Sequence, residues 1–195
     1  MTIDIDAKPD AALLGVGFNV QSFRSDLSGS QNHKELPGSR WAGTLTWSNR
    51  QGLEARTLKA QLTSLRGPID DFRVLPSDHE GLGTALGTGL VNGAGQTGSS
   101  IVTDGWNINQ SILLEIGDYI EINGELKLVT ARVASDGAGN ATIPIQPPIR
   151  KSPADNSTVI TTEPRMTMRL TSPISMASLS APVIYAMSIE AEEVI

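Results

Sequence analysis

Turn-forming residues recur along the whole chain and divide it into short segments. The 195 residues include 19 glycines and 11 prolines, which are spread along the sequence rather than gathered in one stretch. Between them, valine, isoleucine and leucine recur in runs of strand length, several with the alternation typical of half-buried strands. This pattern predicts a β-rich domain with many turns. It excludes a helical bundle, a coiled coil and a fully disordered chain.

The clearest strand pattern lies within residues 112–149. A run from Tyr119 to Ile122 and a run from Leu126 to Val133 flank Asn123-Gly124. This dipeptide is the strongest short hairpin signal, because both central residues of a type I′ turn have positive φ. Other strand-like runs cover residues 18–23, 40–47, 72–75, 141–145, 158–162, 165–170 and 183–189. In the second of these runs we expect Trp41, Leu45 and Trp47 to share a buried face.

One helix is predicted, over about residues 49–66. Ser48 and Gln51 have the spacing of a capping box, and Gly67-Pro68 provides the stop signal. Its apolar residues form a single stripe of Ala55, Leu58, Leu62 and Leu65. The predicted fold is therefore mainly β, a β-sandwich or barrel with one helix covering a sheet.

The domain organisation predicted from these elements is one β-rich domain over residues 18–195, preceded by an N-terminal arm over residues 1–17. Seven glycines fall within residues 81–98, which predicts a long extended Gly-rich loop over 81–105, or an open hairpin in the same place. The arm and this loop are candidate subunit interfaces. The alternatives are a disordered end and a mobile surface loop. The run Glu190-Ala191-Glu192-Glu193 predicts an acidic, exposed C-terminal end.

Composition excludes several further classes of protein. The chain has no cysteine, so a disulfide framework, a thiolate metal site and a cysteine nucleophile are impossible. The net charge of −6 argues against nucleic acid as the primary partner, because phosphate neutralisation needs a basic surface. No apolar run is long enough to span a bilayer, and the acidic start lacks the features of an export signal. We therefore expect a soluble chain that is made inside the cell.

Two patterns match known binding sites only in part. Gly93-Ala94-Gly95-Gln96-Thr97-Gly98 has the spacing of a dinucleotide-binding loop, but strand-like residues follow it where a helix N-terminus would have to hold the pyrophosphate. A hairpin tip is the simpler interpretation. Asp78-His79-Glu80 and the separate His33 lack the spacing of metal ligands, so solvated loops are predicted there.

Other polar and aromatic residues also fall short of a chemical signature. Asp104, Asn107 and Asn109 lack the spacing of a calcium loop and are typical of a turn. The three tryptophans, Trp41, Trp47 and Trp106, could line a sugar-binding groove, although core and interface roles are commoner. The sequence thus predicts no catalytic residues, no cofactor-binding residues and no metal ligands, and we expect a protein that is not an enzyme.

The order of elements carries a resemblance to a known family. A Trp-bearing strand is followed by the Leu-stripe helix with its Leu65-Arg66-Gly67 exit and by the Phe72 strand, and a hairpin region runs from Gly117-Asp118-Tyr119 to Arg150. The helix and strand over 58–74 carry the likeness most closely. In this order and pattern, most of residues 18–190 resembles the distal tail or minor tail proteins of long-tailed (siphovirus-like) bacteriophages.

This resemblance implies a structural virion protein made in the host cytoplasm. Six copies would form a ring that joins the tail tube protein to the baseplate hub and to the tail-tip or receptor-binding proteins, without a cofactor. The alternatives are a head–tail connector or tail-terminator ring protein, and a monomeric carbohydrate- or peptide-binding β-sandwich. In a ring, acidic residues such as Asp70, Asp71 and Glu121 could line the lumen and keep DNA from adhering.

Overall fold

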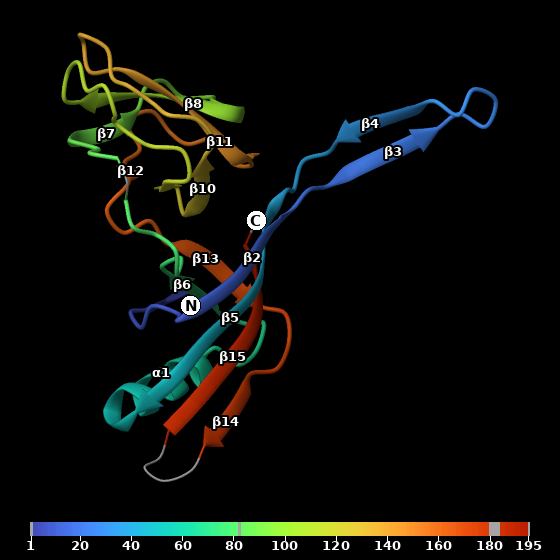
Figure 1. Cartoon of the computed structure of the whole chain (residues 1–195), viewed down its shortest axis with the longest axis vertical. Coiled ribbons are helices and arrows are strands. Elements are labelled where there is room, and N and C mark those ends of the chain that lie inside the picture. Colours follow the sequence, from blue (N-terminus) through green and yellow to red (C-terminus); the bar gives the residue numbers. More distant parts are fainter. Residues whose placement is uncertain (1, 82, 180–183, 195) are drawn as a thin grey trace.

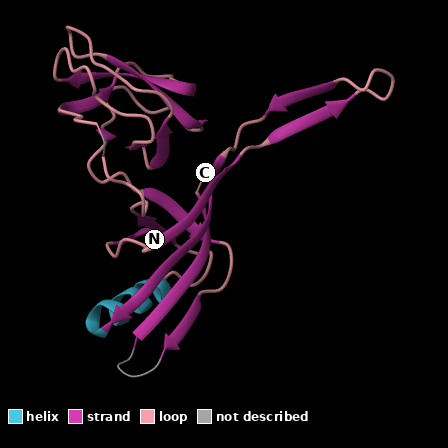
Figure 2. Ribbon diagram, viewed as in Figure 1, coloured by secondary structure: helices cyan, strands magenta, loops and turns pink. Residues whose placement is uncertain are grey.

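Two β-sheets, each with its own hydrophobic core, and a projecting hairpin make up the molecule (Figure 1). The computed structural model describes residues 2–81, 83–179 and 184–194. Strands dominate, and the described residues contain one α-helix (Figure 2). The predicted mainly β fold with one covering helix is confirmed.

The first sheet, in the lower half of Figure 1, has seven strands and includes both ends of the chain. Its strands are β1 (Thr2–Ile5), β2 (Ala11–Gly17), β5 (Arg40–Gln51), β6 (Asp71–Val74), β13 (Met166–Leu170), β14 (Ser175–Leu179) and β15 (Ile184–Glu193). Their order is β1-β6-β13-β15-β5-β2, and β14 also pairs with β15. Only the β1–β6 pair, among the strands described, is parallel. The buried face contains Trp41, Leu45 and Trp47, as predicted.

The helix α1 (Gly52–Ser64) covers one face of this sheet. All four residues of the predicted apolar stripe are buried, and each buried leucine contributes about 1.5–3 kcal/mol relative to an exposed one. The predicted capping box is wrong, because Ser48 and Gln51 lie in β5 and Gln51 makes no side-chain cap. Gly67 has a φ of +71° just after the helix, which is the left-handed conformation expected at this stop.

The second sheet is a nearly closed antiparallel barrel of six strands. They are β7 (Gly87–Val91), β8 (Gly98–Trp106), β9 (Tyr119–Ile122), β10 (Glu125–Val129), β11 (Ala141–Ile149) and β12 (Val159–Ile160), in the order β12-β9-β10-β11-β8-β7. A bridge between Leu90 and Thr158 brings the two end strands together. Asn123 and Gly124 have φ values of 52° and 80°, which confirms the predicted type I′ hairpin.

The predicted Gly-rich loop over 81–105 is wrong for most of its length, because β7 and β8 form an antiparallel hairpin in the barrel. The alternative of a hairpin in this place is therefore the one observed. Its glycines allow close packing: a Cβ at Gly89 would lie 2.1 Å from the ring of Trp106. Gly87, Gly89 and Gly105 thus allow the strand pair to pack closely, whereas Gly93, Gly95 and Gly98 have open space around them.

The N-terminal residues do not form the predicted arm over 1–17. Strand β1 pairs with β6, β2 pairs with β5, and Ile5 is buried in the first core. An arm does exist, but it is the hairpin of β3 (Val20–Arg24) and β4 (Gln31–Glu35), which lies outside both cores (Figure 1). The run over 18–23 was correctly predicted to contain a strand.

Candidate assembly interface

The β3–β4 hairpin, called the arm below, projects away from both lobes (Figure 1). All ten of its strand residues are exposed. The two strands form a separate two-stranded sheet with five paired positions, from Val20 opposite Glu35 to Arg24 opposite Gln31. An isolated two-stranded hairpin is marginally stable in water, so an arm of this kind calls for a partner that covers it.

The arm exposes apolar side chains on both of its faces. Val20 and Phe23 are 48% and 55% exposed, and their odd spacing places them on opposite faces of β3. Leu27 at the tip is fully exposed, and Phe18 at the root is half-exposed. Polar contacts within the arm include the pair Ser22 Oγ and His33 Nδ1, at 2.8 Å. The arm therefore combines an internally ordered hairpin with apolar surface that the described part of its own chain leaves bare.

The root of the arm is continuous with the first sheet. Strand β2 leads into β3, and β4 leads back into β5, so one long ribbon runs from Ala11 to Gln51. At the bend, the Leu36 amide donates to the Asn19 carbonyl at 2.7 Å, and the Asn19 side-chain amide donates to the Pro37 carbonyl at 3.0 Å. The arm is thus an extension of the sheet and not a loose loop.

A hollow of about 710 Å³ separates the root of the arm from the barrel. Its walls come from the returning root segment, from the start of β8 and from the end of β11; they include Leu36, Pro37, Ser39, Ser99, Pro148, Ile149 and Arg150. The hollow leaves room beside the arm root for a segment of another chain.

A buried carboxylate joins the two lobes below this hollow. Glu193 of β15 is fully buried, accepts from the Leu126 amide of the barrel at 2.9 Å, and lies 3.0 Å from the Arg150 guanidinium. Trp41 of β5 donates through its ring nitrogen to the Leu126 carbonyl at 3.0 Å. Burial raises the pKa of Glu193. The expectation of an exposed acidic C-terminal end is wrong at this residue.

A second carboxylate, Glu125, completes this charged junction. Lys127 Nζ lies 2.6 Å from the Glu125 carboxylate and also donates to the Pro148 carbonyl at 2.9 Å. Burial opposes ionisation of Glu125, but the Lys127 and Arg150 cations outweigh it and hold the pKa of Glu125 below its usual range. Burial also lowers the pKa of Lys127. Glu125 and Lys127 thus surround Arg150 on the barrel side, and Arg150 makes the ion pair to Glu193 of the first sheet.

The tryptophans do not line a surface groove. Trp41, Trp47 and Trp106 are 5%, 0% and 5% exposed. Each ring nitrogen donates inside the protein, to the carbonyls of Leu126 and Ala7 and to the Thr103 hydroxyl respectively. Their role is in the two cores, so the sugar-groove interpretation loses the aromatic surface on which it depended.

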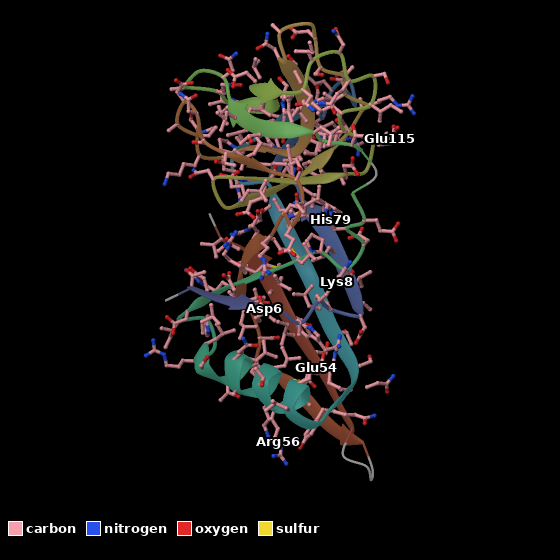
Figure 3. The ribbon with its side chains drawn as sticks, turned by 90° about the vertical axis from the view of Figure 1, so that its left-hand side faces the viewer. Asp6, Lys8, Glu54, Arg56, His79 and Glu115 are labelled. Carbon is pink, nitrogen blue, oxygen red and sulfur yellow. The ribbon has the colours of Figure 1, made fainter. Side chains whose placement is uncertain are left out.

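The partial motifs occupy structural positions. Residues 93–97 lie in the turn between β7 and β8, as predicted, and Gly98 begins β8, so a strand and not a helix follows the motif. His79 lies between the two lobes, where its Nε2 pairs with the Thr162 carbonyl at 3.1 Å and its own carbonyl accepts from Lys8 (Figure 3). His33 lies on the arm. Within the residues described, no three His, Asp or Glu side chains converge as a metal site.

The acids considered for a lumen are engaged with arginines. Asp70 is buried and bonded to Arg66, and Glu121 is buried and ion-paired with Arg73. Asp71 lies 2.8 Å from Arg169 on the neighbouring strand β13. Because these carboxylates hold the first sheet and the barrel in place, the hypothesis that they line a lumen is not supported by their surroundings.

Comparison with known proteins adds no relative. No protein-family model matches the chain, and no curated protein matches its sequence. The described residues also include no helix with the length and apolarity needed to cross a membrane.

The sequence analysis did not identify the arm as an interface, although one signal was present. Gln31–Glu35 is polar at every position, which is typical of a strand with no buried face.

Proposed function

We propose that this protein is a structural virion protein, a ring-forming subunit at the distal end of a bacteriophage tail that joins the tail tube to the baseplate hub or tail tip. The observation that carries the proposal is the arm, an ordered hairpin with both faces exposed and no core of its own. Such an element fits assembly between copies, and contacts that repeat head to tail form a ring when the rotation from one copy to the next closes.

The charged junction supports the same proposal. A ring subunit has to hold its arm at a fixed angle so that successive copies close on themselves. Glu193 and Arg150 join the barrel to the strand β15, which lies beside β5 at the base of the arm. The proposed role is thus architectural and involves no catalysis, no cofactor and no membrane span.

The first test is the mass of the purified chain in solution, combined with negative-stain images of the same sample. Six copies of the 20.7 kDa chain give a particle of about 124 kDa with a central hole. A monomer of 20.7 kDa at all concentrations would contradict the ring. Immunogold labelling of purified phage particles tests the location on the virion, and we expect label at the tail tip. Label at the neck would instead favour the connector or terminator ring.

A variant that lacks the arm tests whether the arm is needed for ring assembly. Since Asn19 and Leu36 are already bonded at 2.7 Å, residues 20–35 can be replaced by Asn-Gly to give a short hairpin. We expect this variant to fold and to be monomeric. The matched control replaces only the tip, residues 25–30, by Asn-Gly and keeps both strands, and we expect it to assemble as the wild type does.

A further inference from the structure

The outer edge of β2 is open and lacks the usual protection of an edge strand. Strand β2 is the last strand of the first sheet, with β5 on one side only. Its seven residues, AALLGVG, include no charged residue and no proline. Native proteins normally protect an edge of this length with lysine, proline, a bulge or a covering segment, because bare strand edges pair with other chains.

The other edges differ from β2. Strand β1 at the opposite end has only four residues, and its Asp4 lies 3.6 Å from Arg73. The barrel is nearly closed by the bridge between Leu90 and Thr158, and closure removes edges. Strand β14 is also open on its outer side, but it is shorter, with five residues. The β2 edge is thus the longest open and uncharged edge among the described strands.

Strand β2 is apolar on both of its faces. Leu13 is 79% exposed on one face. Leu14 and Val16, on the other face, pack against the first core but are only half-buried. A strand added beside β2 would therefore need apolar side chains above and below the sheet. The arm strand β3 has this property, with Val20 on one face and Phe23 on the other.

We infer that the outer edge of β2 receives an arm strand from a second copy of this chain. The arm of the same copy cannot occupy it, because Leu13 and Ser22 are nine residues apart on one extended ribbon, about 30 Å at 3.3 Å per residue. Pairing of arm to edge is head to tail, so each copy both donates and receives. This inference deepens the proposed function and rests on its assumption that copies of the chain assemble.

Cross-linking tests the pairing directly, because the chain has no cysteine of its own. The double variant Leu13→Cys/Ser22→Cys is treated with a short bismaleimide, which tolerates a small register offset, and analysed on a denaturing gel. We expect a ladder of covalent multimers up to the size of the ring. Each single-cysteine variant should give no ladder. The matched control is Thr57→Cys/Ser22→Cys, with Thr57 exposed on α1, and it should give no ladder.

A second cysteine pair tests the competing edge. Leu13→Cys/Ser175→Cys reports direct pairing of β2 with β14 of the next copy. A ladder with this pair and none with Ser22 would overturn the arm assignment while leaving the ring intact. The absence of a ladder in both pairs, together with a ring in negative stain, would also overturn it. A monomer with no ladder would contradict the proposed function as well.

A charge on the edge gives an independent readout. Leu13→Lys introduces the protective residue that β2 lacks, and it should leave the fold intact because Leu13 is largely exposed. We expect loss of the assembled species with an unchanged circular dichroism spectrum. Leu53→Lys, at a position equally exposed on α1, is the control and should assemble normally. Normal assembly of Leu13→Lys would contradict the pairing.

Discussion

Arg150, which follows the barrel strand β11, and Glu193 of β15, the last strand of the first sheet, form a buried ion pair 3.0 Å apart. Arg150 is 6% exposed at its side chain and Glu193 is not exposed at all. The lobes are also joined by the bonds of Leu126 to Glu193 and to Trp41, and by the ion pair of Arg73 with Glu121. The Arg150–Glu193 pair is the most deeply buried ion pair among these links.

Replacement of Arg150 by methionine should destabilise the protein by about 3–5 kcal/mol at neutral pH, because it leaves the Glu193 carboxylate buried without its cation. The measurement is urea unfolding followed by tryptophan fluorescence. The control is Arg40→Met, which removes an ion pair to Glu192 whose side chains are both 38% exposed; we expect a loss of less than about 1 kcal/mol.

The deficit of Arg150→Met should shrink as the pH falls. Burial already raises the pKa of Glu193 above its ordinary value, and loss of the guanidinium should raise it further. A group with a raised pKa in the folded state contributes stability at low pH, and this contribution is lost as pH rises through the folded-state pKa. Unfolding curves at several values between about pH 4 and pH 8 measure the trend. A constant deficit over this range would show that Glu193 does not titrate differently in the variant.

Truncation of Leu62 to alanine should cost about 2–5 kcal/mol, because its side chain is fully buried between α1 and the first sheet. Leu53→Ala, on the same helix, is the matched control. Leu53 is 80% exposed, so its truncation should change the unfolding free energy by no more than about 0.5 kcal/mol. Equal losses in the two variants would contradict the orientation of the helix.

Substitution of Gly89 by alanine should destabilise the barrel by about 1–3 kcal/mol, because the added Cβ would lie 2.1 Å from the Trp106 ring. The fluorescence maximum of the variant should also shift to longer wavelength as Trp106 becomes exposed. Gly137→Ala is the control, since a Cβ there meets its nearest neighbour, the Asn109 side chain, at an ordinary 3.7 Å. An unchanged Tm for Gly89→Ala would show that the ring is free to move away.

Tyr119 should contribute little to the alkaline absorbance change. Burial raises the pKa of its phenol, and the nearby Asp78 carboxylate, which accepts from the hydroxyl at 3.0 Å, raises it further. Spectrophotometric titrations of the wild type and of Tyr119→Phe should therefore superimpose while the protein stays folded. The chain has two tyrosines, so a variant curve with half the amplitude would contradict a buried, hydrogen-bonded phenol.

Local sequence patterns predicted the elements that depend on nearby residues. The stripe from Ala55 to Leu65 gave the helix, because periodicity within one helix fixes which face is buried. The Asn123-Gly124 turn gave the central hairpin for the same reason, since the turn type is a property of two residues. Both features survive in the structure with small changes in their boundaries.

Features that depend on distant residues were missed. Sequence alone indicates that Gly89 is a loop residue. In the structure the ring of Trp106, seventeen positions later, occupies the space where a side chain at Gly89 would lie. Glu193 reads as an exposed acid until Arg150 is placed beside it. The run over 18–23 was predicted as a strand, but its place in a projecting arm was not, because strand propensity says nothing about whether a sheet exists for the strand to join.

The continuity of the arm with β5 has a mechanical consequence. Strand β5 has twelve residues and is bonded on one side to β2 and on the other to β15. A pull on the arm therefore loads these ladders along the strand direction, so that many hydrogen bonds resist the force together instead of opening one after another. A tension applied at the tip would therefore be carried to the centre of the first sheet.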